Sequence, residues 1–280
     1  MTMIPDFYTD EVIKRALSED INYIDLATDL LLDDDAQTTA EFVSKDEGIL
    51  AGIDAALRVF TLMDDTVRTE RLICDGTAVS KGDIIARVTG HTKAILKSER
   101  TALNLVCHMS GVATATNRLV NACKGTKASI ADTRKTTPGL RALEKYAVYI
   151  GGGRNHRFNL SDAAMLKDNH IDAYGSITGA VTALKAKIGH MAKIEVEART
   201  MEDMLEGIAA GADVVMLDNM TVEQMAECVR AADGRVLLEA SGNIDINTVA
   251  AVARTGVDII SSGAITHSAK VFDISLKVRR

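Results

Sequence analysis

The second half of the chain alternates short apolar runs with longer amphipathic segments. The apolar runs are 128–132, 163–166, 193–197, 213–217, 235–240 and 258–262. Between them, apolar residues recur at helical spacing in 139–150, 176–188, 200–211, 222–233 and 246–255. Nearly continuous apolar strands that alternate with helices are typical of a parallel sheet covered by helices. The pattern predicts an α/β architecture with six parallel strands.

Each predicted strand ends in polar or charged residues. These ends are 132–135, 167–169, Glu197, 218–219, 239–241 and 262–263. In a closed barrel all strand ends meet at one mouth, whereas in an open sheet only those beside the switch point share a site. Six such ends favour an incomplete, about six-stranded α/β barrel over an open sheet.

The first part of the chain has a mixed pattern. Thr9 is placed to cap a first helix, and Ala55–Met63 also has helical spacing. Alternating runs at 39–45, 48–53, 68–76 and 83–90 predict strands. Two further helices are expected at 92–107 and 112–123, separated by Ser110-Gly111. This part is an α+β module.

Composition narrows the class of protein. The 280 residues are 47% hydrophobic, enough for one large core or for a large and a smaller one. We expect no transmembrane helix, because no run of eighteen apolar residues exists, and no signal peptide, because the N-terminus lacks an apolar segment. Four scattered cysteines without a Cys-x-x-Cys pair favour a reducing, cytoplasmic location. The net charge of −7 argues against a nucleic-acid partner.

Cations nevertheless gather between Lys93 and Lys167, which indicates a small anionic substrate. Arg134 and Lys135 stand between Thr133 and two further threonines, after a strand and before a helix, and this suits an anion. A solvated turn is the plainer alternative.

A further candidate is the glycine-rich segment 151–157, which ends in His156 and Arg157. Glycines let the backbone approach a ligand, and these two side chains add donors. Lys167, at the end of another strand, could form a Schiff base, bind an anion or be paired structurally.

Glu197 and Asp218 end consecutive parallel strands. Two carboxylates there could hold Mg²⁺ beside a diphosphate, accept hydrogen bonds from ribose hydroxyls, or pair with Lys135 and Lys167. Small-residue turns follow the last two strands, at 241–243 and 262–264, where barrels often bind a phosphate monoester. His91, His108 and His190 are isolated, so we expect no histidine metal site.

Taken together, these motifs resemble the quinolinate phosphoribosyltransferases (carboxylating nicotinate-nucleotide pyrophosphorylases). The similarity runs in order from about Glu11 to the C-terminus and is dense between Glu99 and Ser268. The motifs that carry it are 98–104, 110–113, 132–139, 151–157, 166–171, 195–197, 216–219, 239–243 and 263–267.

The resemblance implies an N-terminal α/β sandwich domain, residues 1–108 with 268–280 returning to it, and an incomplete α/β barrel catalytic domain, residues 109–267. It also implies a homodimer or higher homo-oligomer, in which the partner's N-terminal domain closes each barrel mouth. The implied reaction transfers phosphoribosyl from phosphoribosyl pyrophosphate to quinolinate with loss of CO₂, using Mg²⁺ and no organic cofactor.

The roles that the resemblance implies fall into four groups. Arg100 of the partner subunit, with Thr133, Arg134, His156 and Arg157, would bind the quinolinate carboxylates. Lys135 and Lys167 would serve quinolinate and pyrophosphate, while Glu197 and Asp218 would meet the ribose directly and Mg²⁺ indirectly. The 5-phosphate would be held by Ser241, Gly242, Asn243, Gly263 and Ala264, with His267 nearby.

Two positions depart from the family pattern. Asn159 stands where glycine is usual, and we expect it to adopt the left-handed conformation that asparagine tolerates. The segment 19–25 lacks a usual glycine. Three alternatives stay open: a paralogue associated with molybdate transport, a Schiff-base lyase using Lys167, and a non-catalytic sensor.

Overall fold

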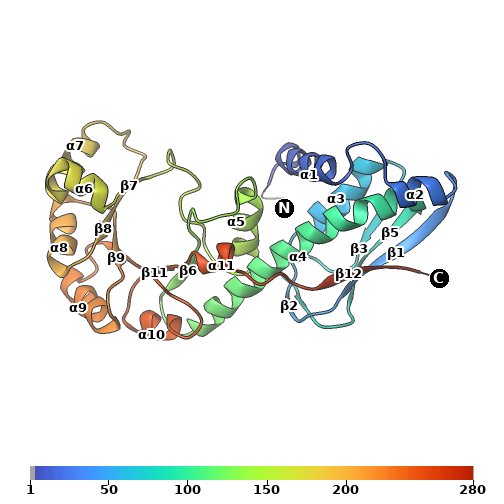
Figure 1. The fold of residues 1–280 in the computed structure, drawn as a ribbon. Coiled ribbons are helices and arrows are strands. Elements are labelled where there is room, and N and C mark those ends of the chain that lie inside the picture. Colours follow the sequence, from blue (N-terminus) through green and yellow to red (C-terminus); the bar gives the residue numbers. More distant parts are fainter. Residues whose placement is uncertain (1–3, 280) are drawn as a thin grey trace. The chain divides into compact units, whose positions relative to one another are not determined.

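The computed structural model describes residues 4–279, which divide into two compact units (Figure 1). Unit 1 combines the segments 4–117, 137–152 and 268–279, and unit 2 combines 118–136 and 153–267. Residues 1–3 and 280, at the two ends of the predicted N-terminal domain, lie outside the described residues. No helix within residues 4–279 is both long and apolar enough to cross a bilayer.

Unit 1 is built on an antiparallel sheet in the order β12-β1-β5-β3. Its strands are β1 (Gln37–Ser44), β3 (Arg68–Arg71), β5 (Ile84–His91) and β12 (Ile274–Val278). Helix α3 (Ile53–Met63) supplies buried apolar side chains to the same core. Phe42 of β1 and Phe60 of α3 are fully buried, with ring centroids 5.9 Å apart in an edge-to-face arrangement.

The other elements of unit 1 are α1 (Asp6–Asp20), α2 (Leu26–Leu31), β2 (Gly48–Ile49), β4 (Ala78–Val79), α5 (Arg141–Ile150) and most of α4 (Thr92–Ala122). The predicted strand 48–53 was mostly wrong, because only two of its residues pair and Ile53 already begins α3. The prediction that Thr9 caps α1 was also wrong. The helix begins after Pro5, whose φ of −61° already suits a helix start.

Helix α4 runs without a break through Ser110-Gly111, where the sequence predicted an interruption. The Ser110 hydroxyl donates to Ala51 O at 3.1 Å and accepts from Ala51 N at 3.0 Å. A Cβ on Gly111 would lie 2.3 Å from Lys270 O. Ser110 and Gly111 are therefore small because the segments around Ala51 and Lys270 pack closely against them. The helix continues through both residues.

Unit 2 contains six parallel strands in the order β6-β11-β10-β9-β8-β7. The strands are β6 (Ser129–Ala131), β7 (Ala164–Leu166), β8 (Ile194–Ala198), β9 (Val214–Asp218), β10 (Leu237–Ser241) and β11 (Ile259–Ser261). The helices are α6 (Asp168–Tyr174), α7 (Ile177–Lys185), α8 (Met201–Ala210), α9 (Val222–Ala232), α10 (Val249–Arg254) and α11 (Ala264–His267). Among the described residues β6 and β7 do not pair with each other, so the ring of strands stays open. The prediction of a six-stranded, incomplete barrel is confirmed.

The units divide differently from the domain boundaries that the resemblance implied. The segment 137–152, which holds α5, belongs to unit 1. Tyr146 of α5 donates its hydroxyl to Asp75 Oδ2 at 2.8 Å, and Asn117 of α4 donates to Gly151 O at 3.2 Å. These contacts hold α5 against the first unit, although the chain reaches it only after β6.

Candidate active site

A cavity of about 490 Å³ lies in unit 2 at the C-terminal ends of the parallel strands. The side chains that line it come from every strand end of the sheet. They are Thr133, Arg134, Lys135, His156, Arg157, Met165, Lys167, Glu197, Met216, Asp218, Glu239, Ser241 and Ser261. Nine of these residues are among the predicted site residues, so the structure brings most of the predicted set into one place.

One side of the cavity is cationic. Arg134 and Lys135 follow β6, and Lys135 N donates to Thr133 Oγ1 at 2.9 Å, which shapes the turn. The Arg157 guanidinium donates from Nη1 to Ala163 O at 2.8 Å. Burial, together with the nearby charge of Arg134, lowers the pKa of Arg157. The positive charges of the two guanidinium groups repel each other, so a bound anion would stabilise both.

Lys167 is half exposed, with its side chain 50% accessible, although it follows directly after a strand of the sheet. Its Nζ lies 3.7 Å from Glu197 Oε2. An exposed side chain beside a carboxylate, without the apolar pocket that activates a lysine as a nucleophile, suits binding of an anion better than Schiff-base chemistry.

Glu197 and Asp218 form the acidic part of the cavity. They lie at the ends of adjacent strands β8 and β9. Burial raises the pKa of Glu197, the charge of Asp218 raises it further, and Lys167 opposes this. Two carboxylates that repel each other in a part-buried site fit a divalent cation, which prefers oxygen ligands.

The turn after β10 is tightly packed. Ser241 pairs with Asp218 across the sheet, and Gly242 has a φ of +103°. A Cβ on Gly242 would lie 2.2 Å from Asn219 Oδ1. Asn243, with a φ of +50°, donates from Nδ2 to the same oxygen at 3.4 Å. The turn therefore exposes backbone in a conformation that glycine and asparagine allow.

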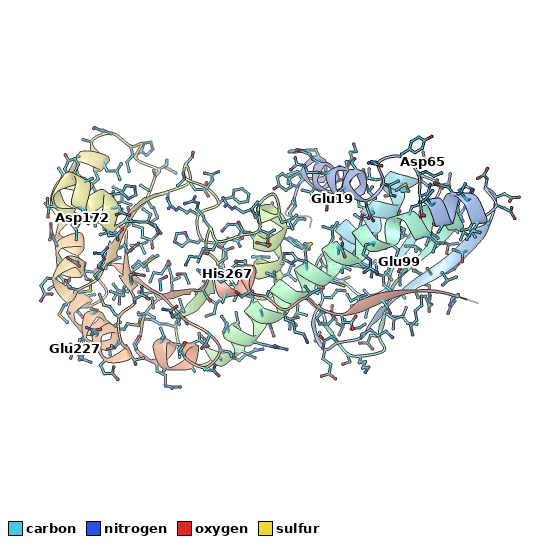
Figure 2. The ribbon with its side chains drawn as sticks, in the orientation of Figure 1. Glu19, Asp65, Glu99, Asp172, Glu227 and His267 are labelled. Carbon is cyan, nitrogen blue, oxygen red and sulfur yellow. The ribbon has the colours of Figure 1, made fainter. Side chains whose placement is uncertain are left out.

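The turn after β11 lies against Lys135. A Cβ on Gly263 would be 2.9 Å from Lys135 Cδ and 3.1 Å from His267 Nε2. Thr266 of α11 also donates its hydroxyl to Lys135 O at 2.8 Å. Ala264 begins α11 and His267, labelled in Figure 2, ends it. The predicted phosphate-binding residues thus lie beside the predicted anion-binding lysine.

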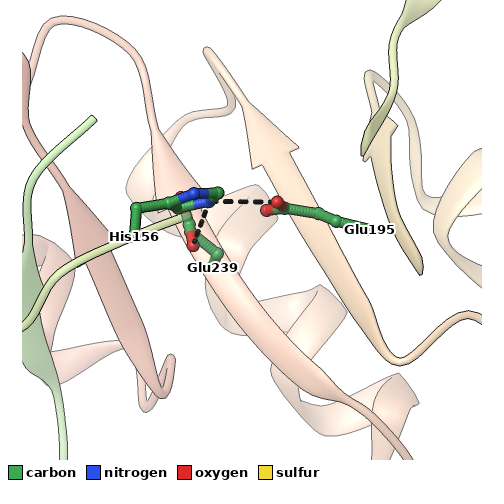
Figure 3. A group of neighbouring side chains, drawn as sticks. All are labelled: His156, Glu195 and Glu239. Carbon is green, nitrogen blue, oxygen red and sulfur yellow. Dashed lines mark ion pairs between the residues drawn. The ribbon is translucent and has the colours of Figure 1, made fainter. Parts of the chain in front are cut away.

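Sequence reasoning assigned no role to a group of buried acids around His156, of which Glu239 lines the cavity. His156 Nε2 lies 3.0 Å from Glu195 Oε2 and 3.6 Å from Glu239 Oε2 (Figure 3). Asp132, which is fully buried, accepts from His156 N at 2.8 Å. The signal was present in the sequence: Glu195 lies two residues before Glu197, so both side chains leave the same face of β8. Glu239 likewise interrupts an apolar run.

Two other expectations have different outcomes. Asn159 does not adopt the left-handed conformation, and this prediction was wrong. Its Oδ1 instead accepts from Ser161 N at 2.7 Å, an ordinary asparagine turn. Arg100 lies exposed on α4 in unit 1, and its role in a partner's site stays a prediction.

Comparison with known proteins identifies the family. Residues 25–110 match the N-terminal domain of quinolinate phosphoribosyl transferase, and residues 112–277 match its C-terminal domain. The chain belongs to the quinolinate phosphoribosyl transferase family. Members of this family include proteins that share two fifths or more of their residues with it.

Two curated relatives and one solved structure illustrate the similarity. The probable nicotinate-nucleotide pyrophosphorylase [carboxylating] of Bacillus subtilis is 44% identical, over 96% of this chain and 92% of that protein. The enzyme of the same name from Mycobacterium leprae is 42% identical, over 95% of each chain. The structure of the nicotinate-nucleotide pyrophosphorylase from Francisella tularensis is 41% identical, covers 99% of this chain and 98% of that one, and superposes with a TM-score of 0.95.

Proposed function

We propose that this chain transfers the phosphoribosyl group of phosphoribosyl pyrophosphate to quinolinate and releases CO₂, which yields nicotinate mononucleotide in NAD biosynthesis. The observation that carries the proposal is the cavity of unit 2. It combines a cationic side, a carboxylate pair and small-residue turns at one edge of the sheet. Near-full-length similarity to proteins named for this reaction supports it.

Quinolinate carries two carboxylates, and the cationic side of the cavity matches that charge. Arg134 and Arg157 would each hold a carboxylate in the bidentate manner of guanidinium groups, with Thr133 beside them. His156 belongs to the same wall, but its ring nitrogens already face Arg157 N and Glu195. We therefore propose that His156 shapes this side of the cavity and does not itself bind a carboxylate. Lys135 and Lys167 would bind the remaining negative charge of quinolinate and pyrophosphate.

Phosphoribosyl pyrophosphate, the phosphoribosyl donor, would lie between the acidic part of the cavity and the turns after β10 and β11. Ser241, Gly242, Asn243, Gly263 and Ala264 would hold the 5-phosphate through backbone N–H groups, with His267 nearby. Glu197 and Asp218 would accept hydrogen bonds from ribose hydroxyls. They would also hold Mg²⁺, directly or through water, and the ion would neutralise charge on the diphosphate. No organic cofactor is needed by the chemistry.

The reaction balances with these groups alone. The pyridine nitrogen lone pair forms a bond to C1 of the ribose, and the C1–O bond breaks with its electron pair leaving on pyrophosphate. Positive charge that develops at C1 is stabilised by the nearby carboxylates. The new pyridinium then accepts the electron pair of the breaking C2–carboxylate bond, CO₂ leaves, and a proton is added at C2.

We also propose a homodimer or higher homo-oligomer in which Arg100 reaches the partner's cavity. The exposed position of Arg100 on α4 supports this. A reducing, cytoplasmic location is supported by four free cysteines, three of them buried. The Schiff-base alternative loses support because Lys167 is paired and solvated. A molybdate-transport paralogue or a sensor would be expected to lack the complete charged set.

The test is an assay of purified protein with quinolinate, phosphoribosyl pyrophosphate and Mg²⁺ that follows nicotinate mononucleotide and CO₂ together. Formation of both products, with nicotinate inactive as a substitute, is the expected result. Absence of product from folded protein would overturn the proposal. Mixing Arg100→Ala with Lys135→Ala tests the shared site, because mixed dimers regain activity only if Arg100 acts across subunits.

A further inference from the structure

The His156 ring is held at both of its nitrogens. Nδ1 accepts from Arg157 N at 2.8 Å, and Nε2 lies 3.0 Å from Glu195 Oε2 (Figure 3). A ring nitrogen that accepts an N–H must offer its lone pair, so the ring hydrogen sits on Nε2 and points to Glu195. These two contacts fix a single tautomer and a single ring orientation.

The two glutamates beside the ring are costly residues for a barrel interior. Glu195 is 6% exposed and Glu239 is 1% exposed. Burial raises the pKa of Glu239 to about 7, the charge of Glu195 raises it further, and His156 opposes this. Within residues 4–279, the Oε1 atoms of both glutamates find no hydrogen-bond partner. Apolar side chains of similar size would pack there at lower cost, which indicates that the carboxylates serve the site.

The three side chains could also be grouped as a metal site, since their ligand atoms all lie within 4.8 Å of one another. A metal would need the lone pair of His156 Nε2. The hydrogen would then have to sit on Nδ1, where it would point at the N–H of Arg157 at 2.8 Å. The contact at Nδ1 therefore favours a hydrogen bond to Glu195 over coordination of a metal.

The same contact connects the ring to the cationic side of the cavity. Arg157 is the next residue, its backbone N–H is held by the ring, and its guanidinium is held by Ala163 O at 2.8 Å. The charge of Glu195 raises the pKa of Arg157 and so opposes the loss of its charge through burial. On the other side, His156 N donates to Asp132 at 2.8 Å.

We propose that Glu195 and Glu239 are positioning residues for the dicarboxylate half of the site. They hold the His156 ring in the Nε2–H tautomer, and the ring aims Arg157 into the cavity. They therefore set the affinity for the pyridine dicarboxylate and not for the phosphoribosyl donor. This inference rests on the proposed function.

The test measures binding of quinolinate to the full chain by calorimetry, without the donor. Glu195→Leu leaves the Nε2–H without its nearer acceptor, and the dissociation constant for quinolinate is expected to rise about tenfold, the equivalent of one unsatisfied buried donor. Binding of phosphoribosyl pyrophosphate should change by less than about twofold. Glu195→Gln keeps an acceptor oxygen, and should restore quinolinate binding to within about threefold of wild type.

Asp64→Leu is the matched control. It removes the acceptor from another carboxylate–histidine contact, to His91 at 2.7 Å in unit 1, and should leave both affinities unchanged. Glu239→Leu, which removes the second carboxylate, should weaken quinolinate binding in the same selective way. A fall in melting temperature with unchanged quinolinate affinity in both leucine variants would overturn the inference.

A second measurement does not depend on the variants folding. In ¹⁵N-histidine-labelled wild type, with the His156 signals assigned from His156→Gln, the ring nitrogens should report a neutral Nε2–H tautomer near pH 7.5. An Nδ1–H tautomer, or stoichiometric shifts of these signals on adding Zn²⁺, would refute it. Wild type that fails to bind quinolinate refutes the proposed function instead, so the two failures are distinguishable.

Discussion

Alanine at position 242 tests how the turn after β10 is built. Gly242 has a φ of +103°, and alanine there costs about 1–2 kcal/mol in strain. Its Cβ would also lie 2.2 Å from Asn219 Oδ1 and 3.0 Å from Asn219 N, so rotation of the side chain alone cannot relieve the contact.

Moving Asn219 would disturb three hydrogen bonds. Asn219 N donates to Ser241 O at 3.0 Å, its Nδ2 donates to Asp218 Oδ2 at 2.9 Å, and its Oδ1 accepts from Asn243 at 3.4 Å. At about 1 kcal/mol each, their loss adds about 3 kcal/mol to the strain. Because the turn is the proposed phosphate site, KM for phosphoribosyl pyrophosphate should rise at least about tenfold, which corresponds to about 1.4 kcal/mol.

Gly175→Ala supplies the comparison. Gly175 ends α6 with a φ of +102°, and nothing lies within 4 Å of a Cβ built there. Gly175→Ala should therefore lose stability through backbone strain alone, without the steric contact expected at position 242. Urea unfolding would give both losses of stability, and initial rates at varied donor concentration would give KM. Equal destabilisation of the two variants, with KM unchanged in both, would refute the reasoning about Asn219.

Three further predictions follow from other parts of the molecule. Because the pKa of Glu239 is raised from 4.5 to about 7, the folded state binds the proton more tightly, and stability should fall by about 3 kcal/mol as pH rises through that window. Glu239→Gln should abolish this fall, measured as the difference in the free energy of unfolding by urea between pH 5 and pH 8. The same difference in wild type and variant would contradict the prediction. Arg157→Ala should weaken quinolinate binding about 10- to 100-fold with little change for the donor, and equal losses in calorimetry would count against its role. Tyr146→Phe removes the hydroxyl that donates to part-buried Asp75, and should cost about 1 kcal/mol of stability without changing kcat; a loss of kcat would place Tyr146 in the site instead.

The sequence indicated the site well because strand ends are a local signal. Each apolar run stops where polar residues begin, and parallel strands bring those ends to one edge. Arg134, Lys167, Glu197 and Asp218 could therefore be grouped before their distances were known, and all four line one cavity.

The residues that sequence reasoning missed depend on contacts between distant segments. Glu195 and Glu239 are within apolar strands, and their partner His156 arrives from a loop. Ser110 and Gly111 have the composition of a helix break, yet Ala51 and Lys270 pack against them. No local pattern contains that information, because each partner lies at least 39 residues away along the chain.

The pairing of β12 with β1 has a consequence for synthesis on the ribosome. Ala40 to Ser44 pair with residues 274–278, about 230 residues later in the chain. At roughly 5–20 residues per second, β1 emerges tens of seconds before its outer neighbour exists. During that interval the nascent first unit presents an open strand edge, the kind of surface that recruits other chains. A nonsense codon near position 270 would make this temporary exposure permanent, while leaving every strand of the six-stranded sheet encoded.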